Sequence, residues 1–443
     1  MKSSTVPRLD DTSGVLQTFE ALKSKTNGYE PSWLCSVRKD AAARFSELNF
    51  PTVRDEEWKY TSVEPIVKNS FSFNFDASTN SPAKGKLETF LFGEADWNLL
   101  VFVNGIYSKE LSSVTPRAEG IEIGSLAEAL KSRPARLEPY LTRQVDFKSN
   151  KFTALNTAFL GDGAFIYIPK GKTIQKPVEL LFISISEEEK IIAQPRNLLV
   201  LGEGSRAEVV ESYVSLNGGP YFTNAVTEIF LEPAASLDHY KIQRENPKAF
   251  HVATTEVSCE RASAYQSYFF TFGAGLSREN LNVALRSEGA SCLLNGLYFV
   301  SGTQHTDHHT AIDHTRPGAT SSQTYKGVLS GEAKAVFNGK IFVRPLAQKT
   351  DAHQTNKNLL LSGRAAVDTK PQLEIFADDV KCSHGAAVGE LDPSEIFYIR
   401  SRGISEEHAR NLLTYGFAGE VIHTVKLEPV RSSLDRLVWQ ALS

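Results

Sequence analysis

A repeat of about 28 residues constrains the fold of this chain more than any other feature. Short corners rich in small residues begin at positions 203, 232, 260 and 288, so the intervals between them are 29, 28 and 28 residues. Related corners begin at positions 331 and 363. Runs of β-branched and aromatic residues lie between the corners, as expected for strands separated by turns.

A strand and a corner at a fixed period favour a β-solenoid, in which successive turns stack and bury a shared core. The repetitive region spans roughly 225 residues, which predicts about eight turns and, at ~4.8 Å per strand layer, a stack roughly 38 Å long. A sandwich of long hairpins has the same spacing and is the alternative. The end strands of a solenoid have free edges that must be capped or paired with another chain.

Helical patterns flank the repetitive region on both sides. Residues 33–48 carry apolar side chains at helical spacing, and Asn104-Gly105 predicts a tight hairpin turn. Asp392-Pro393 is typical of a helix start, and amphipathic segments follow it to the C-terminus. We therefore predict a mainly β protein, with a right-handed β-helix core (161–390) between an N-terminal, mainly helical α/β domain (1–160) and a C-terminal helical domain (391–443).

The composition excludes several classes of protein. The formal net charge of −4 argues against a nucleic-acid-binding protein, and no apolar run approaches the ~18 residues that span a membrane. The first seven residues contain no hydrophobic stretch, so we expect no secretory signal. Four cysteines lie far apart, which argues against a disulfide framework or a four-thiolate metal site: Cys35, Cys259, Cys292 and Cys382. We expect a protein that works in a reducing cytosol.

Cys382 and His384 form the best candidate for a metal-binding pair. On a strand, residues i and i+2 point to the same face, with their Cα atoms roughly 6.5–7 Å apart. The thiol and the imidazole can therefore reach one metal centre. We expect the charge of Lys381 to lower the pKa of the thiol and the carboxylates at 378–379 to oppose this effect. A small buried thiol beside a hydrogen-bonded histidine is the alternative.

A second group of potential ligands, four histidines and two aspartates, lies between positions 305 and 314. Strand alternation places the members of this group on two opposite faces: His305, Asp307, His309 and Asp313 on one, His308 and His314 on the other. A single metal site that uses all of them is therefore not expected. We interpret the segment as a strand whose imidazoles form hydrogen bonds with aspartates and the backbone.

Two further patterns also have structural interpretations. Gln354, Asn356 and Asn358 alternate with other residues and predict a ladder of hydrogen-bonded amides between successive turns. Residues 202–207 match the glycine pattern of a dinucleotide site, but a strand-like run follows them. A dinucleotide site needs a helix there, whose N-terminus faces the pyrophosphate, so we exclude that function.

Five segments spread over nearly the whole chain resemble the SufB/SufD family. They are residues 51–61, 155–171, 349–361, 381–385 and 397–404. The first reads Pro-Thr-Val-Arg-Asp-Glu-Glu-Trp-Lys-Tyr-Thr and is similar to the N-terminal signature of the family. Lys-Cys-Ser-His-Gly at 381–385 is similar to the SufD branch, because SufB is expected to carry a glutamate- and histidine-containing sequence there.

The resemblance implies a non-catalytic subunit of the SUF scaffold for iron–sulfur cluster assembly, with a β-helix core. Such subunits pair with SufB and bind the ABC-type ATPase SufC through their C-terminal helices. A transient cluster is shared with SufB at the SufB–SufD interface, so no permanently bound cofactor is expected. His384 matches the proposed cluster ligand of SufD, and Cys382 matches the cysteine next to it in the motif.

The resemblance also makes a homodimer plausible when SufB is absent, and it implies a bacterial cytoplasmic protein, with a plastid protein as the alternative. A purely structural subunit that docks SufB and SufC without touching the cluster is a second interpretation. A β-helix polysaccharide lyase or hydrolase is a third, but it would require a secretion signal and clustered carboxylates on one outer face.

Overall fold

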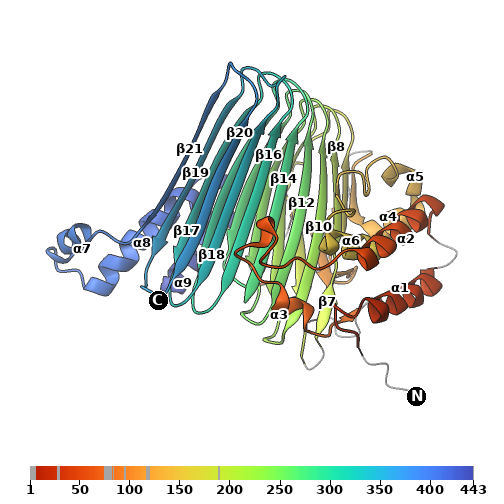
Figure 1. The fold of residues 1–443 in the computed structure, drawn as a ribbon, viewed down its shortest axis with the longest axis horizontal. Coiled ribbons are helices and arrows are strands. Elements are labelled where there is room, and N and C mark those ends of the chain that lie inside the picture. The colour runs from red at the N-terminus through yellow and green to blue at the C-terminus, as the bar shows by residue number, and fades with distance from the viewer. Residues whose placement is uncertain are drawn as a thin grey trace.

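Two long β-sheets face each other and form the body of the protein (Figure 1). The computed structural model describes residues 6–26, 30–73, 82, 84–93, 96–115, 120–187 and 190–442. From β8 onwards the chain alternates between the sheets, and strands that are neighbours within a sheet run parallel. Hairpin strands would be antiparallel. The predicted β-solenoid of about eight turns is therefore confirmed. The first five residues, which bear on the expected lack of a secretory signal, lie outside the described residues.

The strands of each sheet follow one another at intervals of one turn. Sheet 1 contains β1 (Ser72–Phe73), β4 (Glu122–Ser125), β5 (Ala164–Ile168), β7 (Ile191–Ala193), β8 (Arg196–Leu201), β10 (Tyr221–Leu231), β12 (Phe250–Cys259), β14 (Leu276–Leu285), β16 (His305–His314), β18 (Lys334–Val343) and β20 (Ala366–Ile375). Sheet 2 contains β2 (Asn98–Val103), β3 (Ile106–Tyr107), β6 (Val178–Ser184), β9 (Arg206–Ser215), β11 (Ser236–Arg244), β13 (Ala264–Thr271), β15 (Ser291–Val300), β17 (Thr320–Leu329), β19 (Asp351–Leu360) and β21 (Lys381–Gly389).

From β8 to β19, one residue in each corner from sheet 1 to sheet 2 adopts a left-handed backbone conformation. These residues are Gly204 (φ 66°), Ala234 (57°), Ala262 (57°), Gly289 (69°), Gly318 (68°) and Lys349 (62°). Glycine adopts this conformation freely, whereas another residue costs roughly 1–2 kcal/mol. The small residues at the predicted corners 203, 232, 260 and 288 therefore reflect a repeated backbone conformation. The predicted corners at 331 and 363 lead instead from sheet 2 back to sheet 1, and the corner between β20 and β21 has no left-handed residue.

The space between the sheets is filled mainly by apolar side chains. Parallel, in-register pairing places equivalent residues of successive turns next to one another, as for Leu237 and Tyr265. A buried charged cluster interrupts this core, because Lys241 Nζ lies 2.7 Å from Glu279 and 3.8 Å from Glu211. Buried charges are tolerated only when they are paired in this way. No pattern in the sequence had indicated this cluster.

The N-terminal helices cover the outer face of sheet 1 near its first strands (Figure 1). They are α1 (Thr12–Thr26), α2 (Ser32–Glu47), α3 (Glu64–Val67), α4 (Leu126–Ser132), α5 (Pro134–Leu137) and α6 (Lys151–Ala158), with the 3-10 turn η1 (Glu56–Trp58). A second 3-10 turn, η2 (Lys84–Lys86), precedes Leu87, which packs against sheet 2 instead. Phe152 of α6 packs edge-on against Phe222 of β10, with 6.0 Å between ring centroids. The predicted hairpin turns at Asn104 and Gly105, whose φ angles of 51° and 83° are positive as expected.

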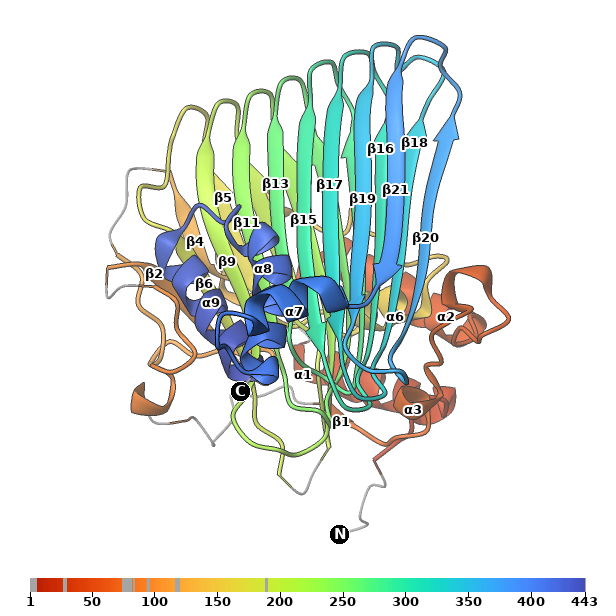
Figure 2. The same ribbon diagram turned by 90° about the vertical axis from the view of Figure 1, so that its left-hand side faces the viewer.

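The C-terminal helices α8 (Glu406–Ile422) and α9 (Glu428–Leu442) lie against the outer face of sheet 2 (Figure 2). Helix α7 (Pro393–Arg400) contacts α8 and projects away from the sheets (Figure 1). Ile422 and Val438 share an apolar cluster with Tyr240 of β11. The predicted helix start is confirmed, because the Asp392 carboxylate accepts a hydrogen bond from the backbone nitrogen of Ser394 at 2.8 Å. None of the helices in the described part of the chain has the length and apolar character needed to cross a membrane.

Candidate functional site

The solenoid is open at its C-terminal end. Within the described part of the chain, β20 pairs only with β18 and β21 only with β19, so each of these last strands has one unpaired edge (Figures 1 and 2). Most residues of β21 are exposed. An unpaired edge offers backbone N–H and C=O groups that another chain can bind. The end of the stack is therefore a surface on which a second protein can complete the sheets.

Cys382 and His384 lie on β21 and face the interior side of this open end. Cys382 is half-buried and packs against the apolar core, and its register partner on β19 is the buried Ala352. His384 follows two residues later on the same face and is exposed. The predicted arrangement, two potential ligands on one face at the end of the stack, is therefore present. His384 is accessible to a partner rather than enclosed.

Burial raises the pKa of the Cys382 thiol above its usual value, and the Asp351 carboxylate on β19 acts in the same direction. The expectation that Lys381 lowers this pKa is therefore wrong. By strand alternation the Lys381 side chain lies on the outer face, whereas the thiol faces inward. The carboxylate that opposes the thiolate is also not at 378–379 but on the neighbouring strand. The thiol is thus protonated at neutral pH.

A thiolate and an imidazole are suitable ligands for iron or zinc. Such metals take four ligands in most protein sites. The described residues contain no group of three or more His, Cys, Asp or Glu side chains placed to hold a metal ion. A complete metal site at β21 would therefore need further ligands from a second chain or from inorganic sulfide.

The histidine-rich strand β16 has a structural role on both of its faces. The predicted division is confirmed, because His308 and His314 are buried, whereas His305 and His309 approach N-terminal residues outside the sheets. Burial lowers the pKa of His308 to about 3, so its imidazole is neutral at physiological pH. His309 Nε2 lies 3.1 Å from Asp307, as a structural interpretation of this segment predicts.

The outer face of β16 anchors the N-terminal strap, which we define as residues 52–61. Thr61 Oγ1 donates a hydrogen bond to the Asp307 carboxylate. Arg278 Nη1 of β14 donates to the same carboxylate at 2.6 Å, and the guanidinium lies 4.2 Å from the ring centroid of Trp58. The family-like signature at 51–61 therefore docks onto the histidine-rich strand. Sequence reasoning had not connected these two segments.

The N-terminal strap continues towards the open end of the solenoid. Glu57 forms an ion pair with Lys340 of β18, and Glu56 forms one with Lys370 of the edge strand β20. His309 and Lys340 lower the pKa of Glu57 to about 2, although burial opposes them. The strap therefore crosses the outer face of sheet 1 as far as its last strand.

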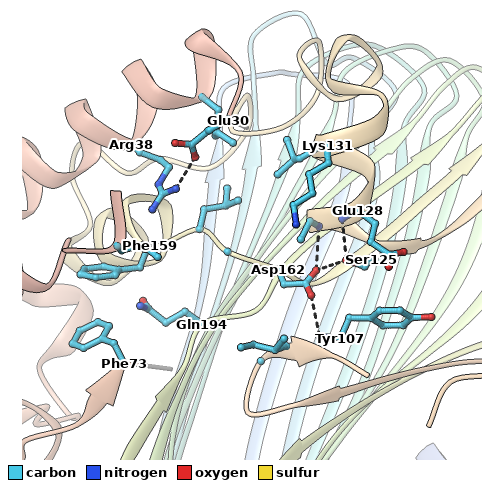
Figure 3. A pocket seen from close by; sticks show the side chains of 18 of the residues that line it. Glu30, Arg38, Phe73, Tyr107, Ser125, Glu128, Lys131, Phe159, Asp162 and Gln194 are labelled. Carbon is cyan, nitrogen blue, oxygen red and sulfur yellow. Dashed lines mark hydrogen bonds and ion pairs between the residues drawn. The ribbon is translucent and has the colours of Figure 1, made fainter. Parts of the chain in front are cut away.

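A cavity of about 430 Å³ lies at the opposite end of the solenoid, between α2, α4 and the β2–β3 hairpin (Figure 3). The Asp162 carboxylate at its wall accepts hydrogen bonds from Ser125 Oγ at 2.7 Å and from the backbone nitrogen of Tyr107 at 2.9 Å. Arg38 Nη1 lies 2.6 Å from Glu30 Oε1. These charged groups hold the surrounding elements together, and the cavity is remote from Cys382 and His384.

The predicted amide ladder is present only in part, in the interior close to the open end: Gln354 bonds to an amide of the previous turn, whereas Asn356 and Asn358 bond to Tyr298 and to each other. Gln354 Nε2 donates to Gln323 Oε1 at 2.8 Å, and Asn356 Nδ2 donates to Tyr298 Oη at 3.0 Å. Thr369 of β20, which sequence reasoning missed, donates its hydroxyl to Asn356 Oδ1 at 2.8 Å. Only knowledge of which strands face each other across the interior could have indicated this residue.

Comparison with known proteins covers almost the whole chain. Residues 182–417 match the family model described as "SUF system FeS cluster assembly, SufBD core domain", and residues 12–180 match "SufBD protein N-terminal region". An iron–sulfur cluster assembly SufBD family protein of Synechocystis sp. is 34% identical over 95% of this chain and 94% of its own length. The iron–sulfur cluster assembly protein SufD of Escherichia coli is 34% identical over 88% and 89%, and SufB of Bacillus subtilis is 24% identical over 88% and 85%.

Proposed function

The chain belongs to the SufB/SufD family of iron–sulfur cluster assembly proteins, on its SufD side, and from this we propose that it is a non-catalytic scaffold subunit. In this proposal the chain pairs with SufB through the open end of its solenoid and contributes His384 and Cys382 to a nascent cluster at the contact. The observation that carries the proposal is the position of this pair, which faces inward on a strand whose outer edge is unpaired.

The surface around the open end supports the pairing with SufB. Large apolar side chains are exposed there, with exposed fractions of 57% for Phe376 and 48% for Val388. Exposed apolar groups of this size, next to unpaired strand edges, are typical of protein–protein contacts. SufB has homologous sequence and would present equivalent edges, so backbone hydrogen bonds can continue from one solenoid into the other.

The C-terminal helices support a second contact, with the ATPase SufC. Phe397 and Tyr398 of α7 are 72% and 60% exposed. In the proposed assembly SufC covers these side chains. Nucleotide-driven movement of SufC then displaces α7, which is joined to β21 by a connection of only a few residues, and opens the ligand pair to incoming iron and sulfide.

The cluster is cargo in this proposal, and the chain supplies part of its coordination. The Cys382 thiol would lose its proton when it binds iron, because the thiolate is the ligand form. The His384 imidazole would bind iron through a neutral ring nitrogen. SufB or the sulfide of the cluster supplies the remaining ligands, as the absence of a third suitable side chain among the described residues requires.

Complementation by single-residue variants tests the ligand role. Cells that lack the chain receive His384→Ala or Cys382→Ala, and the complex with SufB and SufC is purified under anaerobic conditions. We expect an intact complex with His384→Ala but little bound iron and sulfide. His353→Ala is the matched control, because His353 is an exposed histidine on the neighbouring β19 whose Nδ1 contacts Ser383 instead. Normal cluster content with His384→Ala would favour the purely structural subunit.

Hydrogen exchange tests the proposed movement. Exchange across 381–388 is compared in the assembled complex with and without ATP. We expect faster exchange with ATP, because displacement of α7 exposes the backbone of β21. Unchanged protection in an active complex would count against the movement while leaving the ligand role intact.

A further inference from the structure

A row of buried amides runs between successive turns and ends next to His384. Gln323 Nε2 donates to Thr310 Oγ1 at 2.6 Å, and Gln354 Nε2 donates to Gln323 Oε1 at 2.8 Å. The pairing of β17 with β19, and of β19 with β21, places Gln323, Gln354 and His384 at one register position in three successive turns. His384 is therefore the next residue in line after the last amide.

The last amide of the row has an unused oxygen. Gln354 is 1% exposed, and its Oε1 is buried and accepts no hydrogen bond from the described residues. The oxygen and nitrogen of an amide diverge from one carbon, so the oxygen cannot share the Gln323 partner of the nitrogen, and β21 is the strand on the other side of β19. A buried acceptor without a donor costs about 1–3 kcal/mol, and native proteins retain few of them without a reason.

Close packing fixes the orientation of this amide. Gly339 of β18 lies across the interior, and a Cβ atom at that position would come within 1.9 Å of Gln354 Nε2. The glycine therefore makes room for the amide group, and the acceptor Gln323 Oε1 determines that the nitrogen, not the oxygen, of Gln354 faces β17.

We propose that Gln354 is a positioning residue for His384, whose ring N–H donates a hydrogen bond to Gln354 Oε1. Adjacent strands lie about 4.8 Å apart, so a change of the exposed His384 rotamer brings the two groups together. A neutral imidazole has one N–H and one nitrogen with a lone pair. When the N–H is held by Gln354, the lone pair of the other nitrogen faces the open end. Histidines that bind metals commonly donate their second nitrogen in this way.

The role of this hydrogen bond in orienting a metal ligand rests on the proposed function. The bond itself does not, because it joins two side chains of this chain. Its test is therefore independent of iron and of SufB. The full-length chain is labelled with ¹⁵N-histidine, and two-bond ¹H–¹⁵N spectra are recorded above about pH 8, where an ordinary imidazole is neutral. The spectra identify which ring nitrogen carries the proton, and His384→Ala assigns the signal.

We expect a single tautomer of His384 in the parent chain and a mixture of both tautomers in Gln354→Met, which keeps the side-chain length but removes the acceptor. Gln354→Glu keeps an oxygen at this point and should restore the single tautomer. Asn358→Leu is the matched control, because Asn358 is a buried amide on the same face of β19 whose register partner is Val388. It should leave the His384 spectrum unchanged.

A mixture of tautomers in the parent chain, or a single unchanged tautomer in Gln354→Met, would overturn the proposal. If Gln354→Met does not fold, Gln354→Asn replaces it, since its shorter side chain cannot reach both neighbours. The cluster assay separates the two proposals. A tautomer that depends on Gln354, together with normal cluster content in His384→Ala, would retain the positioning role and reject the ligand role.

Discussion

Replacement of Asp307 by asparagine should weaken the attachment of the N-terminal strap by an amount that follows from burial. The Asp307 side chain is 1% exposed, and that of its ion-pair partner Arg278 is 2% exposed. Burial alone would raise the pKa of Asp307, but Arg278 and His309 hold it well below the usual range. Asparagine keeps the size of the side chain and leaves the Arg278 charge buried without its counter-charge.

Asp313 provides the internal comparison, because it lies on the same strand and the same outer face. Its carboxylate pairs with Arg344 at 2.8 Å, but the two side chains are 31% and 46% exposed. Removal of one partner from a buried ion pair costs about 3–5 kcal/mol, whereas an exposed pair contributes about 0–1 kcal/mol. Asp307→Asn should therefore destabilise the protein by at least about 2 kcal/mol more than Asp313→Asn.

Native-state hydrogen exchange measures this difference locally, which suits a chain too large for simple two-state unfolding. In Asp307→Asn, amides of the strap between residues 55 and 61 should exchange about 30-fold faster or more, the equivalent of about 2 kcal/mol or more. Amides of α8 should be unaffected. Equal protection of the strap in both variants would refute the reasoning, because it would show that burial does not decide the strength of this pair.

The Asp307 carboxylate has a lowered pKa, so its contribution to the free energy of unfolding is fully present above pH ~4 and is lost as the pH falls further. The melting temperatures of the parent protein and of Asp307→Asn should therefore converge as the pH falls below that value. Gly204 has a φ of 66° and open space around it, so Gly204→Ala should lower the free energy of unfolding, measured by thermal unfolding, by about 1–2 kcal/mol. Gly85 also has open space around it but no positive φ, so Gly85→Ala should change the stability little. Iodoacetamide should modify Cys382 faster at pH 9 than at pH 7, because its raised pKa leaves little thiolate at neutral pH. Cys292 is buried and its pKa lies well above its usual value, so peptide mass spectrometry should show no modification of this residue until the protein unfolds. Modification of native Cys292 at a similar rate would contradict this.

The architecture could be predicted because its determinants are local. A corner with a left-handed residue recurs every turn from β8 to β19, and glycine or alanine occupies most of these positions, so the period is visible in the sequence. The helix start at Asp392 was equally visible, because its side chain accepts a backbone hydrogen bond within the first turn of the helix.

The candidate site could be predicted only in part. Alternation along β21 placed Cys382 and His384 on one face without any tertiary information. The pKa of Cys382 could not be predicted, because it is raised first by burial in the folded core and then by the carboxylate of Asp351, which lies on a neighbouring strand in the previous turn. The same limit applies to the N-terminal strap, since Thr61 and Asp307 meet across 246 positions of sequence.

The two ends of the solenoid differ, and this difference limits how the molecule can assemble. The N-terminal end is closed by the chain itself, through the antiparallel pairs β2–β3 and β4–β5 and the helices around them. Among the described strands, β3 and β4 end the two sheets there and are short and partly buried, whereas β20 and β21 at the other end are long and largely accessible. When two such molecules meet through β20 and β21, the long unpaired edges of both become paired. Growth into a fibre, the usual hazard of an uncovered strand, is then disfavoured, because the remaining edges are short and lie among helices.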